Sequence, residues 1–302
     1  MINKVVGLYF SPSGDTARLT KRVAEEIATR MDDTCIENLS VSYIDLLRNP
    51  LMEDCTFDEE TIVVMGIPAF TGRVPLPCVK MIQKMHGKNT MTVCLVDYGN
   101  SSYGDALYEL YTFMEDQGFS VLSAGAFVSQ HVIFKKIAAC RPDVRDLQKV
   151  KEFCELTSRK LHRFCGTMIQ ELRAKPAPLD IKGSIPHKAP LRLPLHPTPN
   201  KHCTNCGACA QICPMGAINL RDVRKVDVRK CFSCTACIRA WNTICGNRKP
   251  PVLRIYFFIH FFYKNKHKAL FKKPLTGEKQ GFRIQVYNFK RRGRMVPEQR
   301  KR

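Results

Sequence analysis

The stretch Val5–Phe10, with the sequence VVGLYF, runs directly into Ser11–Thr16, with the sequence SPSGDT. A compact apolar run that ends in Ser, Pro and Gly predicts a buried strand followed by a turn. From Ala17 to Met31 the apolar residues recur at helical spacing, so we expect the turn to lead straight into a helix. The chain therefore begins with a predicted strand–loop–helix unit.

The same alternation of apolar strands and amphipathic helices continues to about residue 130, and one more helical pattern follows it. Further strands are expected at Val41–Leu47, Thr61–Gly66, Met91–Val96 and Val121–Val128, with helices at Leu76–Met85, Tyr103–Gln117 and Asp143–Leu172. Continuous apolar strands separated by helices indicate a parallel sheet that is covered on both faces. The predicted fold class is α/β, a doubly wound parallel five-stranded sheet in the flavodoxin-like order 2-1-3-4-5.

The loop Ser11–Thr16 is a candidate site for the phosphate of FMN. Free N–H groups of a first helical turn and nearby hydroxyls can hold a phosphate, and no lysine is required. The residues concerned are Ser11, Ser13, Gly14, Asp15 and Thr16. In the alternative interpretation, Asp15 or Thr16 merely caps the helix. A carboxylate at Asp15 facing the phosphate would also repel it.

Two further loops follow the third and fourth predicted strands, at Pro68–Arg73 and Tyr98–Gly104. In an open parallel sheet, ligands bind outside the carboxyl ends of the strands, where these loops would lie. The candidate flavin contacts are Phe70, Tyr98, Gly99 and Asn100. Either aromatic ring could stack on the flavin, or could equally pack beneath its own loop.

A run of four cysteines has the spacing of a bacterial ferredoxin. The run consists of Cys203, Cys206, Cys209 and Cys213, followed by Pro214. Two-residue steps wrap three thiolates around one cluster, and the three-residue step points the fourth toward a second cluster. A zinc ribbon would instead separate two cysteine pairs by a longer loop. The run therefore predicts binding of a 4Fe–4S cluster.

A second run is incomplete. It consists of Cys231, Cys234 and Cys237. Trp241 stands where the fourth cysteine is expected, and the next cysteine is Cys245. Under crossed ligation, Cys213 and the second run would hold one complete cluster. The other cluster, on the first three cysteines of the first run, needs another ligand. Cys245 could serve, a three-iron cluster could form, water or another ligand could occupy the position, or this cluster could be labile or absent.

The composition excludes some classes of protein. Fifteen cysteines follow an N-terminal apolar run too short for a signal peptide, so we expect a cytoplasmic redox or metal protein rather than a secreted disulfide scaffold. No stretch has the roughly 20 uninterrupted apolar residues of a spanning helix. Residues 1–173 carry 20 Lys and Arg against 22 Asp and Glu, whereas residues 174–302 carry 28 against 5. So basic a half favours an acidic partner protein, an anionic membrane surface or nucleic acid.

Four segments are expected: a flavodoxin-like domain (1–173), a linker with seven prolines (174–200), a 4Fe–4S ferredoxin-type domain (201–250) and a basic, aromatic-rich extension (251–302). Within the extension, residues 251–273 could pack on the sheet domain or contact a partner or a membrane surface. The basic tail resembles a nucleic-acid patch, but no fold for groove or strand recognition is visible. We expect His131 to be structural, and Cys94, Cys154 and Cys165 to be small core residues.

Together these features resemble the EFR-type ferredoxin family of anaerobic bacteria, in which a flavodoxin-like domain precedes a two-cluster ferredoxin domain. The resemblance covers about residues 3–240. It rests on the first cysteine run and on YFSPSGDT at 9–16, GIPAFTGRVP at 66–75 and DYGNSSYGDAL at 97–107. It implies intracellular electron transfer, with FMN and two 4Fe–4S clusters. The departure is Trp241, where family members have a complete Cys-x3-Cys-Pro.

The function expected from the sequence is that of a carrier which shuttles low-potential electrons between redox partners. Its partners would present acidic docking faces to the basic half. The alternative is a flavin-dependent reductase that the clusters feed with electrons, although no acid–base constellation is visible. A nucleic-acid-binding protein is a third class, and it lacks a recognition fold.

Overall fold

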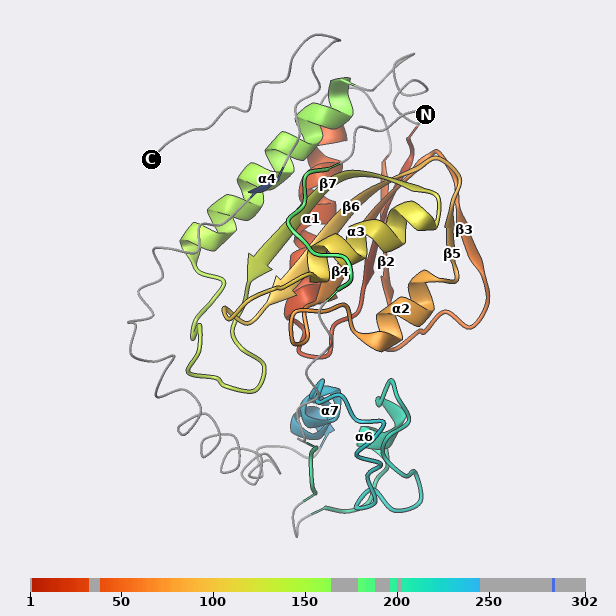
Figure 1. Cartoon of the computed structure of the whole chain (residues 1–302), viewed down its shortest axis with the longest axis vertical. Coiled ribbons are helices and arrows are strands. Elements are labelled where there is room, and N and C mark those ends of the chain that lie inside the picture. The colour runs from red at the N-terminus through yellow and green to blue at the C-terminus, as the bar shows by residue number, and fades with distance from the viewer. Residues whose placement is uncertain are drawn as a thin grey trace.

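The structure is a computed structural model, and it describes residues 2–32, 39–163, 179–187, 196–199, 203–244 and 284–285. Strands and helices alternate through its first part (Figure 1). In chain order the elements are β1 (Lys4–Tyr9), α1 (Asp15–Asp32), β2 (Ser40–Asp45), β3 (Cys55–Phe57), β4 (Thr61–Pro68), α2 (Leu76–Ile82), β5 (Met85–Gly87), β6 (Thr90–Tyr98), α3 (Ala106–Asp116), β7 (Phe119–Val128), α4 (Val144–Arg163), α6 (Ala208–Gln211), α7 (Ala236–Ile244) and β8 (Ile284–Gln285).

The main sheet has the order β2-β1-β4-β6-β7-β8. Its first five strands are parallel, and only the two-residue β8 runs antiparallel, at the edge beside β7. The five parallel strands follow the predicted order 2-1-3-4-5, which confirms the flavodoxin-like fold class. The short edge strand β8 was not predicted.

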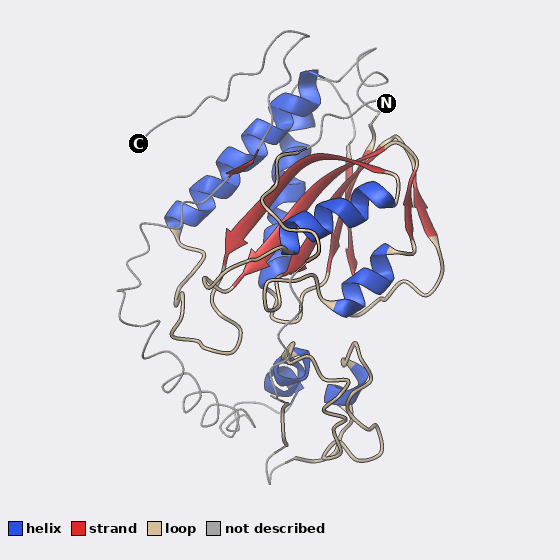
Figure 2. Cartoon of the chain, viewed as in Figure 1, coloured by secondary structure: helices blue, strands red, loops and turns tan. Residues whose placement is uncertain are grey.

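Burial on both faces explains why the strand sequences are continuously apolar. Every residue of β4, with the sequence TIVVMGIP, is buried. Side chains alternate between faces along a strand, so Ile62 and Val64 join one core cluster while Val63 and Met65 join the other. Helices α1 and α4 cover the first face, and α2 and α3 cover the second (Figure 2).

One predicted helix is too long. The helix expected over Leu76–Met85 ends at Ile82, and Met85 instead begins β5, which pairs in parallel with β3 as a separate two-stranded sheet. Met85 is fully buried in this arrangement. Its partner in the register is Cys55, thirty positions earlier, and no periodicity within one segment reveals such a pairing.

The described part of the predicted linker packs on the sheet domain. Leu179 and Ile181 are buried in the core cluster under α2 and α3. The Ser184 hydroxyl donates to Asp105 Oδ2 at 3.1 Å, and the Ser184 N–H points to the other carboxylate oxygen at 3.3 Å. Residues 179–187 contain no helix or strand, but Leu179, Ile181 and Ser184 attach them to the sheet domain.

The cysteine-rich part lies beyond the carboxyl ends of the parallel strands, below the sheet in Figure 1. It contains α6 and α7 and a β-bridge between Ile218 and Val226. Ala210, Ile218 and Val223 form its small core, with several cysteines packed around them. A core this small is typical of a domain that relies on a metal centre for stability.

Several predictions lie outside the described residues: the continuation of the α4 helix after Arg163, Cys165, Cys245, the surface-contact segment 251–273 and the basic tail. Of the other cysteines predicted to be core residues, Cys94 and Cys154 are fully buried, as expected. Within the described part of the chain, no helix combines the length and the hydropathy that crossing a bilayer requires.

Candidate functional site

Each predicted hydroxyl of the loop between β1 and α1 lies beside a hydrogen-bonding partner. Ser11 Oγ accepts the N–H of Ala17 at 2.9 Å, and Ser13 Oγ lies 3.4 Å from the N–H of Asp15. The buried Thr16 hydroxyl donates to Asp97 Oδ2 at 3.2 Å. Ser11 and Ser13 therefore act on the first turn of an 18-residue helix, and the helix start is the feature that favours an anion.

Two arginines surround the remaining loop residues. Asp15 forms an ion pair with Arg18, which lessens the repulsion that its carboxylate would exert on a phosphate. Gly14 has a φ of +98°, in the left-handed region that favours glycine. An ideal Cβ at Gly14 would lie 3.0 Å from Nη1 of Arg239, so a side chain from the cysteine-rich part covers this glycine.

Asp97 lies beneath the loop at the end of β6. It is 6 % exposed, and burial, aided by the charge of Asp15, raises its pKa to about 7. Hydrogen bonds from Ser129 and Thr16 oppose this shift only in part. The carboxyl therefore changes its protonation near neutral pH, directly under the candidate phosphate loop.

The other two predicted loops lie at the same edge of the sheet. Asp105 N donates to the Gly72 carbonyl at 2.9 Å, so the loop after β4 and the loop after β6 are joined. Phe70 contacts the ring of Phe232 edge-on, with ring centroids 5.6 Å apart. Tyr98 contacts Tyr103 edge-on at 5.4 Å. Each candidate aromatic thus has a ring partner, and stacking on a flavin stays a prediction for both.

The loop after β4 is held by a largely buried ion pair. Arg73 Nη2 and Nε donate to the two carboxylate oxygens of Glu109 at 2.7 and 2.9 Å. The N–H of Val74 donates to the same carboxylate at 2.9 Å. A bidentate pair of this kind fixes geometry as well as charge. It therefore fixes Phe70, whose backbone bonds Arg73 in both directions, relative to α3.

Of the other two residues predicted in the β6 loop, Gly99 lies next to His131. A Cβ at Gly99 would be 2.9 Å from His131, and Asn100 has a φ of +60°. His131 Nδ1 accepts the N–H groups of Ile133 and Phe134, both at 3.1 Å. Burial lowers its pKa to about 4, so it is a neutral, structural histidine, in line with the expectation.

The thiols of Cys203, Cys206 and Cys209 in the first cysteine run lie close enough to interact electrostatically. Burial raises the pKa of the Cys209 thiol, and the neighbouring thiols of Cys203 and Cys206 raise it further. Cys206 is exposed, whereas Cys203 and Cys209 are half-buried. These three thiols are therefore near one another, as their spacing predicts.

Cys213 belongs electrostatically with the second run. Burial raises the pKa of Cys234 to about 12, with further contributions from Cys213 and Cys231. Burial also raises the pKa of Cys237. The thiols of Cys234, Cys231 and Cys213 raise it further, and each contributes more than the thiol of Cys209. Cys213 Sγ accepts the N–H of Ala217 at 3.3 Å, the kind of hydrogen bond that tunes a cluster's potential. The structure thus places Cys213 beside the second run, as crossed ligation requires.

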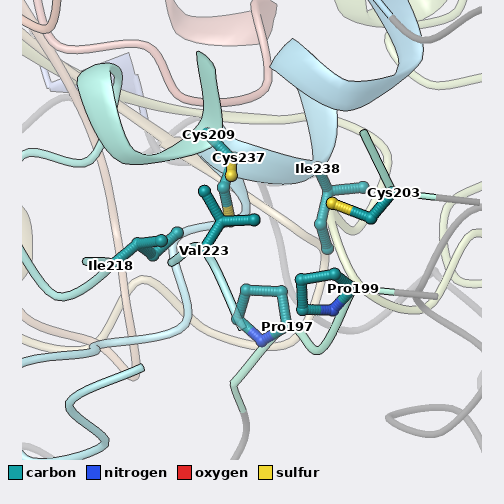
Figure 3. A pocket seen from close by; sticks show the side chains of 8 residues that line it. All are labelled: Pro197, Pro199, Cys203, Cys209, Ile218, Val223, Cys237 and Ile238. Carbon is teal, nitrogen blue, oxygen red and sulfur yellow. The ribbon is translucent and has the colours of Figure 1, made fainter. Parts of the chain in front are cut away.

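A cavity lies between the two runs. Figure 3 shows three thiol-bearing side chains around it, from both runs, among apolar neighbours; the lining residues are Pro197, Pro199, Cys203, Cys209, Ile218, Val223, Cys237 and Ile238. Among the residues that the structure describes, no three Cys, His, Asp or Glu side chains converge as ligands of one metal ion. A four-iron cluster holds its thiolates around a larger unit than a single ion.

Position 241 lies on helix α7, one turn after Cys237 and therefore on the same face. The helix continues through Ile244, and Cys245 follows outside the described residues. Ligation of a cluster by Cys245 therefore stays a prediction.

Sequence reasoning missed two residues, Phe232 and Arg239. Phe232 lies between Cys231 and Cys234, and it packs against the core of the sheet domain. Arg239 Nη1 lies 3.3 Å from the Ser11 carbonyl oxygen, to which it donates. An aromatic residue inside a cysteine run, such as Phe232, is a weak sequence signal for a contact with another domain. Arg239 gave no such signal, because it is one of many basic residues in its half of the chain.

Residues 200–219 match the family described as a 4Fe–4S binding domain, which confirms the predicted iron–sulfur character of the first cysteine run. No curated protein matches the sequence.

Solved structures similar to this chain include a flavodoxin from the domain Archaea (17% identity, TM-score 0.36), which covers 53% of this chain and 99% of its own. Flavodoxin 1 from Bacillus cereus (17% identity, TM-score 0.34) covers 52% and 97%. The apo form of the NADH:FMN oxidoreductase EmoB (12% identity, TM-score 0.36) covers 52% and 89%. The strand order itself, rather than these likenesses, establishes the fold of the first part.

Proposed function

We propose that this chain is an electron-transfer protein that exchanges electrons between a 4Fe–4S cluster in its cysteine-rich part and FMN at the edge of its sheet. The observation that carries this proposal is the contact between Phe232 and Phe70. Phe232 stands between two predicted cluster ligands, and Phe70 stands in a loop predicted to hold the flavin. The two candidate redox sites therefore meet within one chain.

A second contact supports the same juxtaposition. Cys234 is buried, and its thiol is close enough to Cys78 in α2 to add to the rise in the Cys78 pKa that burial causes. The second cysteine run thus faces the sheet domain with both an aromatic ring and a predicted ligand. The cluster expected on that run would be the one next to the flavin.

The ligand sets follow from the two groups of thiols. We assign the complete cluster to Cys213, Cys231, Cys234 and Cys237, because their spacing fits crossed ligation and Cys213 lies close enough to the second run to raise the pKa of its three thiols. A second cluster on Cys203, Cys206 and Cys209 would lack a fourth thiolate at position 241. Cys245, a non-cysteine ligand or a three-iron cluster remain the candidates for that position.

The residues of the β1–α1 loop suit the FMN phosphate. Ser11 and Ser13 accept N–H groups of the first turn of α1, Thr16 is anchored to Asp97 beneath the loop, and Gly14 lets the backbone approach a ligand closely. When bound, FMN would accept or donate one or two electrons, whereas a cluster passes one at a time. The chain's own residues would bind the phosphate, position Phe70 and Tyr98 at the ring, and separate the site from water.

The finer features of the proposal rest on the sequence. The resemblance to the EFR-type ferredoxin family supports an electron carrier, and the cysteine-rich composition supports the reducing cytoplasm as its location. The basic cysteine-rich half suits redox partners with acidic docking faces.

The first test is composition. Protein purified without oxygen should contain iron and sulfide in equal amounts, and one FMN per chain should be released on denaturation. Zinc without sulfide would refute the cluster, and an absence of released flavin would refute the FMN site. Turnover of a small substrate would instead favour a reductase, and salt-sensitive binding to DNA would favour the nucleic-acid alternative.

The second test addresses the electron route. Cys213→Ser removes the ligand that joins the two runs, so we expect iron content to fall by one cluster and flavin reduction by a one-electron donor to slow. Cys140→Ser, at an exposed cysteine outside both runs, is the matched control and should change neither. Flavin reduction as fast in Cys213→Ser as in the parent, despite the lost iron, would show that this cluster is not the route.

A further inference from the structure

The cysteine-rich part contributes a cation to the candidate phosphate loop of the other domain. Arg239 lies on α7, two residues after the predicted ligand Cys237. Its Nη1 lies 3.3 Å from the carbonyl oxygen of Ser11, to which it donates. An ideal Cβ at Gly14 would lie 3.0 to 3.1 Å from Nη1, Nη2 and Cζ. The guanidinium therefore lies directly over the glycine of the loop.

The loop supplies no cation of its own. Ser11–Thr16 contains no Lys or Arg, and its one charged residue is Asp15. The nearest basic residue along the helix, Arg18, is paired with that carboxylate. Hydroxyls and N–H groups can cradle a phosphate, but they do not neutralise its charge. Arg239 is the basic side chain that the fold brings to the loop from outside the sheet domain.

We propose that Arg239 binds the phosphate of FMN, so that the ferredoxin-type domain completes the flavin site of the flavodoxin-like domain. This inference rests on the proposed function. Arg239 is exposed in the structure, so a phosphate bound at the loop would be within reach of the guanidinium that lies over Gly14. Guanidinium is well suited to this role because its planar donors can pair with two phosphate oxygens.

The same face of the cysteine-rich part makes both contacts with the flavin edge. Phe232 meets the loop after β4, and Arg239 meets the loop after β1. Both residues belong to the second run and the helix that follows it. Binding of FMN would therefore favour the docked arrangement of the two domains, and docking would favour FMN, since the coupling acts in both directions.

The test compares FMN with riboflavin, which has the same ring but no phosphate. Full-length protein freed of flavin is titrated with each compound, and unbound flavin is measured by fluorescence after ultrafiltration. Arg239→Gln should weaken FMN binding about tenfold or more, the usual effect of losing a charge-assisted hydrogen bond, and change riboflavin binding less than twofold. Arg239→Lys should retain part of the FMN affinity because it keeps the charge.

Arg224→Gln is the matched control, because it removes an exposed arginine from the same domain and should leave both affinities unchanged. An equal loss of FMN and riboflavin affinity in Arg239→Gln would indicate a structural role and overturn the inference. Unchanged FMN affinity would overturn it as well. If the parent protein binds neither compound, the proposed flavin site itself fails, and that outcome is distinct from a site that binds FMN without Arg239.

Discussion

Replacing Asp97 by Asn should make the stability of the sheet domain less dependent on pH. Burial raises the pKa of this carboxyl to about 7, whereas in an unfolded chain it is about 3.9. Between these values the folded protein holds a proton that the unfolded chain has lost. The wild-type protein therefore loses stability as pH rises from about 4 to about 7, and the loss is complete above pH 7.

The size of the effect follows from the shift. Three pKa units correspond to about 4 kcal/mol over the whole range, of which about 3 kcal/mol falls between pH 5 and pH 8. An amide at position 97 has the shape of the neutral acid and can still accept from Thr16. The free energy of unfolding of Asp97→Asn minus that of the wild type should therefore grow by about 3 kcal/mol from pH 5 to pH 8.

The assay is urea unfolding, followed by circular dichroism on full-length protein at several pH values. Asp116→Asn serves as a control, because it removes an exposed carboxyl from the same domain, and such surface changes alter stability by about 0.5 kcal/mol or less. A difference between Asp97→Asn and the wild type that stays constant from pH 5 to pH 8 would refute the reasoning. It would mean that Asp97 is ionised throughout this range.

Two further substitutions test the loops at the flavin edge. Glu109→Gln removes one charge of a largely buried ion pair and leaves the charge of Arg73. We therefore expect the free energy of unfolding to fall by about 3 kcal/mol, measured by thermal unfolding. An unchanged midpoint of unfolding would contradict the role given to this pair. Gly104→Ala would place a Cβ 2.6 Å from the carbonyl oxygen of Gly72, at a φ of +53°, and should cost about 2 kcal/mol or more. Gly216→Ala, at a φ of +56° with no atom within 4 Å of the new Cβ, measures the backbone strain alone. If it lowers the free energy of unfolding as much as Gly104→Ala does, the close approach of the two loops contributes nothing to the loss.

The strand order was predictable because most of the parallel strands are apolar runs that can be recognised in the sequence. A segment such as β4 is buried on both faces, so its whole sequence is apolar and stands out against its neighbours. The loops that follow such strands must meet at one edge, which is why Ser11, Phe70 and Tyr98 could be grouped before their positions were known. The parallel pair β3 and β5 was not predicted, because each strand is only three residues long and their pairing is non-local.

The contacts between the domains were not predictable for a related reason. Arg239 and Ser11 are separated by most of the described chain, and nothing in the spacing of either segment refers to the other. Ligand spacing does reveal a cluster, because the geometry of a cubane is imposed on neighbouring residues. It says nothing about which side of that cluster faces a second domain, and so the role of Phe232 emerged only from the fold.

The attachment of residues 179–187 to the sheet domain has a consequence for how the protein could serve an outside partner. Ser184 is fixed to Asp105, and Pro197 lines the cavity of the cysteine-rich part, so the chain between Ser184 and Pro197 connects the two parts. Even fully extended, a chain of that length reaches at most about 50 Å. The cysteine-rich part therefore stays at a local concentration on the order of millimolar relative to the flavin edge. At that concentration a small interface between the two parts suffices for frequent docking. A small interface also dissociates quickly, so the cluster could contact another protein between docking events.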